Sequence, residues 1–139
     1  MQIQYKLVSM EVVSVDFFKD VFNKEKEEMN IHNSFSFGVD VSHHVLLCLH
    51  QISLQQEGKD FFAIQLNSLF ALSPNSFNGM KKGKSLGIPQ EFLVQCASIS
   101  YGSMRGIVLL KAKENGLENI ILPPAYMSDI IKSPMTVEL

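Results

Sequence analysis

The sequence of 139 residues is poor in cysteine and in charge, and neither charge sign dominates. The two cysteines, Cys48 and Cys96, stand among apolar neighbours, so we expect buried, reduced thiols instead of a disulfide framework. Twelve Lys and Arg against fourteen Asp and Glu give a net charge of −2. Because such a chain has no positive field to attract phosphates, we expect no nucleic-acid partner.

Long apolar runs are also absent from the sequence. No run reaches the roughly 18 residues of a membrane span, and the first residues alternate polar with apolar, unlike a signal peptide. We therefore expect a cytoplasmic protein without membrane insertion. The composition is nevertheless 46% hydrophobic and only 19% charged, so we expect part of the apolar surface to serve a partner.

The sequence offers no complete set of metal or cofactor ligands. His43 and His44 are neighbours on a predicted strand and would point to opposite faces, whereas Cys48 and His50 could share a face. A closed zinc site needs about four ligands, so ordinary strand residues are the simpler interpretation. The lysines of residues 81–84 lack the strand-and-helix frame of a phosphate loop. We predict that the protein binds no metal and no cofactor.

Nucleophiles and bases are present but stand in no recognisable catalytic frame. No serine, cysteine or histidine occupies a nucleophile elbow or a Gly-rich anion loop. The best enzyme hypothesis is a small hydrolase that uses a loop carboxylate such as Asp40 or Asp60. We predict that the protein is not an enzyme and keep the hydrolase as an alternative.

Period-two alternation predicts four strands, over residues 5–17, 34–43, 45–56 and 60–73. In the first, the apolar positions change phase between Val12 and Val13, which predicts a β-bulge. The turn at Glu57, Gly58 and Lys59 joins the last two strands into a hairpin.

The second predicted strand carries an apolar stripe. Phe35, Phe37, Val39 and Val41 point one way, and serines and Asp40 point the other. The stripe has two interpretations, core packing or contact with a bound polypeptide, and the sequence does not decide between them.

Pro89 and Glu91 indicate the first turn of a long helix with a buried face. Gly102 and Gly106 each cost about 1 kcal/mol against Ala in a helix interior. With Ser98 they form a stripe of small residues at four-residue spacing, which permits close helix approach. The helix ends either at Gly106 or at the stop signal of residues 115–116.

Between these elements, residues 73–87 read as a turn-rich connection, and residues 127–132 as a short final helix. The order predicts one α+β domain over residues 1–139. Its four-stranded antiparallel sheet carries the long helix and the short C-terminal helix on one face.

Three short pairs in the C-terminal half resemble the SecB family of export chaperones. They are Arg105 with Gly106, Leu122 with Pro123, and Asp129 with Ile130. The hairpin of residues 52–73 and the first strand, residues 4–17, are similar to the corresponding strands of that family.

The resemblance implies an ATP-independent holdase that binds unfolded or precursor polypeptides for export. It also implies a homotetramer, a dimer of dimers, with the long helices packed between two sheets and clients in apolar grooves between helix and sheet. The predicted client-binding residues are Phe35, Phe37, Val39, Leu109, Leu110, Ile121, Leu122 and Tyr126. The predicted oligomer interface comprises Ser98, Ile99, Gly102, Met104 and Gly106.

The sequence departs from this family where the family meets its motor, SecA. Ile64 and Gln65 stand where the family often carries a glutamate, Asp16 alone keeps an acidic position, and a long acidic tail is missing. The resemblance therefore implies SecA as a partner, but these positions lack the acidic residues with which the family binds it. A rival interpretation is a dedicated chaperone for one partner, for example an antitoxin.

Overall fold

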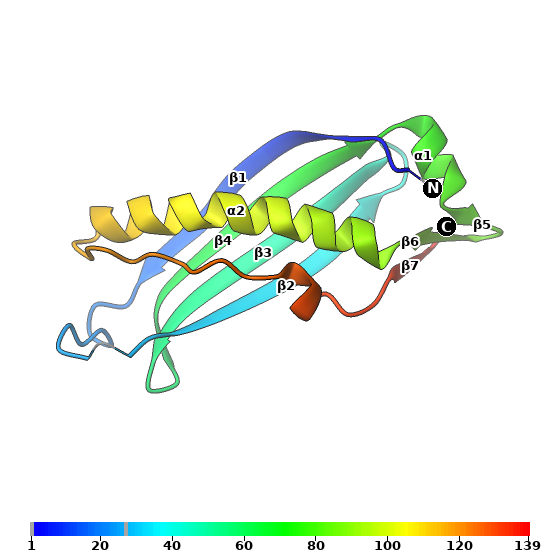
Figure 1. The fold of residues 1–139 in the computed structure, drawn as a ribbon. Helices are drawn as coiled ribbons and strands as arrows, with labels where there is room; N and C mark the ends of the chain where they lie inside the picture. Colours follow the sequence, from blue (N-terminus) through cyan, green and yellow to red (C-terminus); the bar gives the residue numbers. More distant parts are fainter. Residues whose placement is uncertain (1, 27) are drawn as a thin grey trace.

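The computed structural model describes residues 2–26 and 28–139. Four long strands form an antiparallel sheet in the order β1-β4-β3-β2, as Figure 1 shows. They are β1 (Tyr5–Phe17), β2 (Asn30–Asp40), β3 (Val45–Gln56) and β4 (Lys59–Leu72). All four predicted strands are confirmed, and β2 begins four residues earlier than the sequence suggested.

The pairing between strands explains where the chain bends. β1 shifts register against β4 twice, between Val12 and Ser14 as predicted and also between Leu7 and Ser9. Between β3 and β4, Glu57 and Gly58 both adopt positive φ, 52° and 75°. Two successive positive φ values are typical of the tight hairpin turn whose twist matches the flanking strands.

One long helix, α2 (Gln90–Glu114), lies across one face of the sheet (Figure 1). Pro89 stands at the N-cap position with extended backbone, one residue before the first turn, and makes no side-chain capping hydrogen bond. The helix passes Gly102 and Gly106 without a break and ends before Gly116, which has a φ of 81°. Packing of α2 on the sheet offsets the propensity cost of the two glycines, because its buried residues continue to Ala112.

The connection after β4 contains more structure than predicted. It includes α1 (Pro74–Gly79), which Ser73 caps, and the short strands β5 (Lys81–Lys82) and β6 (Ser85–Ile88). These strands form a second sheet, β5-β6-β7, with β7 (Met135–Glu138). Strands of two to four residues are too short for their alternation to be recognised in the sequence.

The predicted C-terminal helix is shorter than expected. Only a 3₁₀ turn, η1 (Met127–Asp129), forms within residues 127–132. Pro134 favours extended backbone at Ser133, so no helix could continue beyond residue 132, and the chain enters β7 at Met135.

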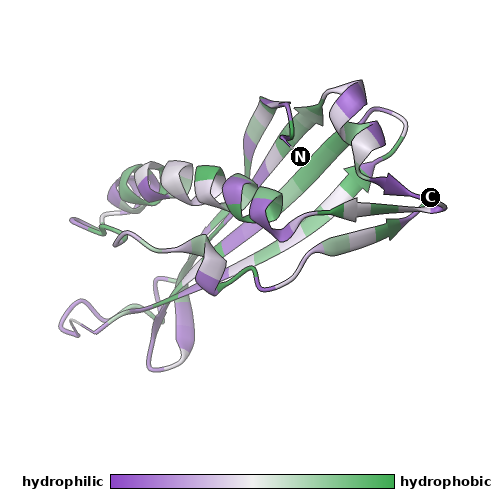
Figure 2. Ribbon diagram, turned by 45° about the vertical axis from the view of Figure 1, so that its right-hand side comes forward, coloured by the Kyte–Doolittle hydropathy of each residue, from purple (hydrophilic) through white to green (hydrophobic). Residues whose placement is uncertain are grey.

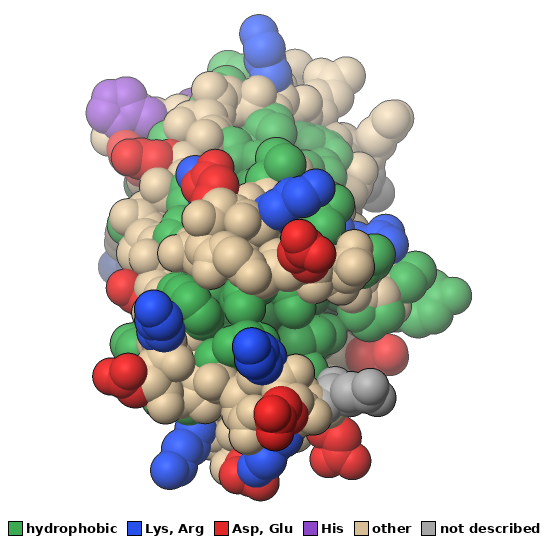
Figure 3. All heavy atoms as spheres, turned by 90° about the vertical axis from the view of Figure 1, so that its left-hand side faces the viewer, with side chains coloured by type: hydrophobic (Ala, Val, Ile, Leu, Met, Phe, Trp, Pro, Cys, Tyr) green, Lys and Arg blue, Asp and Glu red, His purple; other side chains and the backbone are tan. Residues whose placement is uncertain are grey.

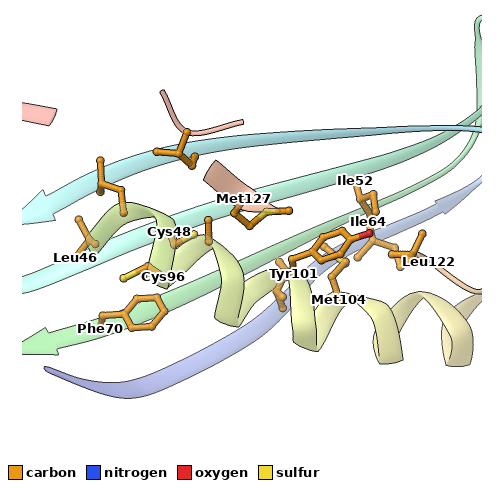
Figure 4. Close-up of a cluster of buried hydrophobic side chains, with 14 of the residues drawn as sticks. Leu46, Cys48, Ile52, Ile64, Phe70, Cys96, Tyr101, Met104, Leu122 and Met127 are labelled. Carbon is orange, nitrogen blue, oxygen red and sulfur yellow. The ribbon is translucent and has the colours of Figure 1, made fainter. Parts of the chain in front are cut away.

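The core lies between the sheet and α2 (Figure 4). Cys48 from β3 and Cys96 from α2 are both fully buried there as free thiols, as predicted. Burial raises the pKa of Cys48 to about 12, so this thiol stays neutral. Figure 2 shows hydrophobic residues alternating with polar ones along the long strands, as a sheet with one covered face requires.

By length and composition α2 would also pass as a membrane-spanning helix. Nine of its residues are buried, and this buried side packs on the sheet in the manner of a core helix. Since core helices pass the same test, the length and composition of α2 are weak grounds for a membrane span.

Candidate functional site

The segment after α2, residues 115–134, which we call the crossover, runs back along the helix (Figure 1). Side chains of α2 fasten its backbone at three points. The Tyr101 hydroxyl donates to the carbonyl of Pro123 at 2.7 Å, and Arg105 Nε donates to that of Leu122 at 3.1 Å. Gln90 Nε2 donates to the carbonyl of Ile131 at 2.8 Å. A segment whose only regular structure is the short turn η1 is thus held in a defined position.

The crossover divides its apolar side chains between the core and the surface. Leu117, Leu122, Met127 and Ile131 are buried, and Leu122 is only 1% exposed. The prediction that Leu122 contacts clients is therefore wrong for this subunit. Leu122 belongs to the core between the crossover and the helix. Its burial anchors the crossover, because transfer of an apolar side chain out of water is favourable.

Four of the predicted client-binding residues are exposed, and we call them the outer patch. Leu109 and Leu110 lie in the last turns of α2, and Ile121 and Tyr126 lie on the crossover. Leu110, Ile121 and Tyr126 are 64%, 66% and 80% exposed. Leu109 lies one turn beyond Arg105 on the same side of α2, so it faces the crossover.

Further apolar residues are exposed at the end of the molecule where α2 finishes. Phe18 and Val21, in the connection after β1, are 46% and 37% exposed. The space-filling view of this end shows hydrophobic side chains exposed between charged ones (Figure 3). Apolar surface gathered within a polar rim marks binding sites on proteins.

The stripe on β2 lies on the helix side of the sheet. Phe35, Phe37 and Val39 are each partly buried and pack against the core. The ring of Phe35 stacks on that of His50 with 4.1 Å between centroids. Core packing thus buries part of each side chain in this stripe, and the part that stays exposed can contact a partner.

The predicted oligomer interface follows the outer side of α2, with one exception. Ser98, Gly102 and Gly106 are exposed and Ile99 is half-buried. Met104 is fully buried, so its assignment to an interface is wrong, because the sheet already covers that side of the helix. A Cβ added at Gly102 or Gly106 would meet nothing within 4 Å. The fold of this subunit therefore gives no steric reason for either glycine.

A buried polar cluster joins the sheet to the helix. His50 Nδ1 lies 2.8 Å from the hydroxyl of Ser100, and His50 Nε2 lies 2.8 Å from Oδ1 of Asn33. Burial lowers the pKa of His50 to about 4, so the ring is neutral at pH 7. Asn33 Oδ1 can only accept, so Nε2–H donates to it, and Nδ1 accepts from Ser100. Sequence reasoning noted His50 only as a metal candidate and missed this cluster.

Neither serine–histidine pair of the described residues is arranged for hydrolysis. Ser100 beside His50 is fully buried, so no substrate reaches its hydroxyl. On the exposed β2–β3 turn, the Ser42 hydroxyl donates to Asp40 and His43 Nδ1 binds the same carboxylate at 2.8 Å. Those hydrogen bonds, Ser42 first, lower the pKa of Asp40. They hold the turn together and leave the carboxylate exposed to solvent, unsuited to act as a base.

Asp60, the other carboxylate of the hydrolase alternative, lies exposed at the start of β4. It accepts a hydrogen bond from Gln55 Nε2 at 2.7 Å. The part of the chain that the structure describes contains no group of three or more potential metal ligands. These arrangements give the hydrolase alternative no support.

No known family model and no curated protein sequence matches this chain. A search of solved structures finds a SecB-like chaperone of Mycobacterium tuberculosis in complex with a ChAD peptide from the HigA1 antitoxin. The two chains superpose with a TM-score of 0.58 over 86% of each, at 9% sequence identity. The fold is SecB-like. The predicted α+β class, the antiparallel four-stranded sheet and the long helix are thereby confirmed.

Proposed function

We propose that this protein is an ATP-independent chaperone that holds unfolded polypeptides on the outer patch and the neighbouring exposed apolar residues. The observation that carries the proposal is the exposure of Leu110, Ile121 and Tyr126 on a rigidly fastened support. Preorganised apolar surface binds many sequences, because burial of apolar area does not depend on a particular hydrogen-bond pattern. The SecB-like fold supports this function by analogy.

The proposal includes an assembly that resembles the SecB tetramer. Gly102 and Gly106 weaken the helix by about 1 kcal/mol each and meet no steric need within the subunit. Such residues are favoured where another helix backbone approaches closely, so we assign the outer side of α2 to contact with a second copy. Ile99, half-buried beside them, would become covered in that contact.

The wider role that we propose is cytoplasmic: clients are precursor polypeptides held unfolded before export. We do not propose SecA as a partner. Ile64 is fully buried in the core, so this position cannot contribute to an acidic docking face. Gln65 lies on the other face of the sheet, and the residue that pairs with it on β1 is Ser14, which is not acidic.

A dedicated role is the second candidate function. The solved neighbour holds a peptide from an antitoxin, which favours a chaperone for one partner over a general one. A pull-down from native cytosol distinguishes the two roles. A single stoichiometric partner, encoded beside this gene, would support the dedicated role, whereas many unrelated precursors would support general holding.

Aggregation of a chemically unfolded protein tests the proposed function. The purified protein should suppress light scattering at about one tetramer per client, and neither ATP nor EDTA should change this activity. The sequence has no phosphate loop, and the described residues contain no group of three or more potential metal ligands. No suppression at any ratio would contradict the proposal, and so would activity that depends on ATP or is lost on chelation.

A further inference from the structure

Three exposed lysines, Lys81, Lys82 and Lys84, stand on one tight hairpin. β5 and β6 form this hairpin, which lies at the end of the molecule opposite the end where α2 finishes (Figure 1). At its tip Gly83 has a φ of 61°, as the first residue of a type II′ turn requires. We call residues 81–86 the lysine hairpin.

Hydrogen bonds hold the backbone of the lysine hairpin at its tip. Ser85 Oγ donates to the carbonyl of Lys82 at 3.1 Å. The backbone N–H of Leu139 donates to the carbonyl of Lys84 at 2.8 Å. At the base, Leu86 is fully buried and ties the hairpin to the core. The three lysines are therefore carried on a fixed support.

The lysines point to both faces of the hairpin. Successive residues of a strand alternate between faces, so Lys81 and Lys82 point in opposite directions. Lys81 shares a face with its partner Leu86, and its Nζ lies 5.4 Å from the centre of the buried Phe77 ring. Lys82 shares the other face with its partner Ser85. A ligand of the whole hairpin must therefore present negative charge on two sides.

No counter-charge neutralises the lysine hairpin within the part of the chain that the structure describes. The salt bridges of that part all join other residues. Glu138 of β7 belongs to the same small sheet, but it pairs with Ser85 on the side of β6 away from β5. Two strand spacings, about 10 Å, thus separate its strand from β5. Three like charges in four residues repel one another, so the fold gains nothing from this arrangement.

We propose that the lysine hairpin binds an extended acidic segment of a partner protein, at a site separate from the outer patch. Consecutive carboxylates of an extended segment point alternately to either side, so they reach Lys81 on one face and Lys82 on the other. Exposed ion pairs are individually weak, so the segment must contact several lysines at once. The site goes beyond the holding of clients, because it leaves the outer patch free for a client while the partner is bound.

An acidic polypeptide fits the lysine hairpin better than a nucleic acid does. The whole chain carries a net charge of −2, so the positive potential is local and screened beyond about 10 Å. Proteins that hold single strands stack the bases on exposed aromatic rings, whereas Phe77, the ring beneath Lys81, is fully buried. The single arginine of the sequence, Arg105, is engaged with the crossover.

Fluorescence anisotropy of a labelled acidic peptide, titrated with the full chain, tests the proposal. The probe contains about six consecutive glutamates, which span about 20 Å when extended. It should bind saturably at low ionic strength, and its affinity should fall as salt is added. Replacement of Lys81, Lys82 and Lys84 together by glutamine should weaken binding more than about tenfold. Absence of saturable binding would overturn the proposal.

A second variant controls for the loss of positive charge. Replacement of Lys19, Lys24 and Lys59 by glutamine removes the same charge from exposed positions outside the hairpin, and should weaken binding less than about twofold. Equal weakening in the two variants would show a general effect of net charge and overturn the proposal. Circular dichroism and the free energy of unfolding should be the same for both variants and the parent, because all six positions are exposed.

Two further probes test the shape of the ligand. A peptide with the same number of glutamates, alternated with serine, presents its carboxylates on one side when extended and should bind more weakly than the consecutive one. Equal affinity of the two peptides would overturn contact with both faces. An oligothymidylate of the same net charge should also bind more weakly. Tighter binding of this DNA, abolished by the hairpin substitutions, would assign the hairpin to nucleic acid and overturn the proposal.

Suppression of aggregation distinguishes this site from the client surface. Neither the glutamate peptide nor the hairpin substitutions should change it, because the outer patch contains none of these lysines. A loss of suppression in either case would place the acidic peptide on the client surface and overturn a separate site. Intact binding of the peptide by a chain that suppresses no aggregation would support the lysine hairpin and contradict only the proposed function.

Discussion

The two sides of α2 carry different kinds of residue. The side that faces the sheet buries Phe92, Leu93, Cys96, Ala97, Ser100, Tyr101, Met104, Val108 and Ala112. The outer side presents Ser98, Gly102, Gly106 and the exposed leucines Leu109 and Leu110. The inner set belongs to the core, apart from Ser100, which hydrogen-bonds His50, whereas the outer set contributes little to the stability of the subunit. Residues that a fold does not need are the ones to examine for partners.

A substitution on the inner side of α2 should change stability most. Met104→Ala removes a fully buried side chain and leaves a cavity between helix and sheet, which should lower the free energy of unfolding by about 2–5 kcal/mol. Chemical denaturation measures the change. Leu110→Ala, at a position 64% exposed, is the matched control and should alter stability by less than about 0.5 kcal/mol. Equal losses of unfolding free energy in the two variants would contradict the claim that only the inner side of α2 stabilises the subunit.

The inner side also predicts a dependence of stability on pH. The unfolded chain protonates His50 near pH 6.5, whereas the folded protein resists until about pH 4 because burial lowers the pKa of the ring. As pH falls through this window the unfolded state binds more protons, so stability should decrease by about 3 kcal/mol. His50→Gln should remove this decrease, and His43→Gln, on an exposed turn, should keep it. An unchanged slope in His50→Gln would place the pH dependence elsewhere.

The next effect concerns binding by the outer patch. Simultaneous replacement of Leu110, Ile121 and Tyr126 by serine should weaken binding of an unfolded polypeptide more than about tenfold, or about 1.4 kcal/mol. The free energy of unfolding and the circular dichroism spectrum should stay those of the parent. Leu122 is left intact in this variant because it belongs to the core. Unchanged affinity would move the binding surface away from the outer patch.

The smallest effect on the subunit concerns the glycines. Gly102→Ala with Gly106→Ala should raise helix stability by about 1 kcal/mol per site, because neither new methyl group meets a neighbour. The same methyl groups should separate two helices that pack on this side, so light scattering should show a smaller assembly. A tetramer of undiminished stability would contradict the assignment of this side to a second copy. Gln95→Ala, also exposed on α2, is the control.

The long elements could be predicted from the sequence because each repeats one pattern over many residues. β1 to β4 show period-two alternation, and the hairpin turn carries its own signal at Glu57 and Gly58. The second sheet has no such repeat, because its three strands contain two to four residues. The cap of α1, Ser73 before Pro74, was a readable signal that the turn-rich composition around it obscured.

The candidate site was harder to predict, because exposure depends on partners distant in the sequence. Leu122 and Ile121 are neighbours of similar hydrophobicity, yet one is buried and the other 66% exposed. The hydrogen bond from Arg105 to the Leu122 carbonyl fixes which of the two faces the helix. Met104 stands between Gly102 and Gly106 in the sequence, but it lies on the side of the helix that carries Ser100, and the sheet covers it. Only a three-dimensional structure assigns such residues to core or surface.

Titration of a permanently unfolded, carboxymethylated protein shows whether this protein holds unfolded polypeptides without ATP. Fluorescence anisotropy of the labelled client should rise saturably with this protein, with a dissociation constant in the micromolar range or tighter, about −8 kcal/mol, in the absence of ATP. A folded form of the same client, with its disulfides intact, should not bind. No saturable binding of the unfolded form, or equal binding of both forms, would contradict the account.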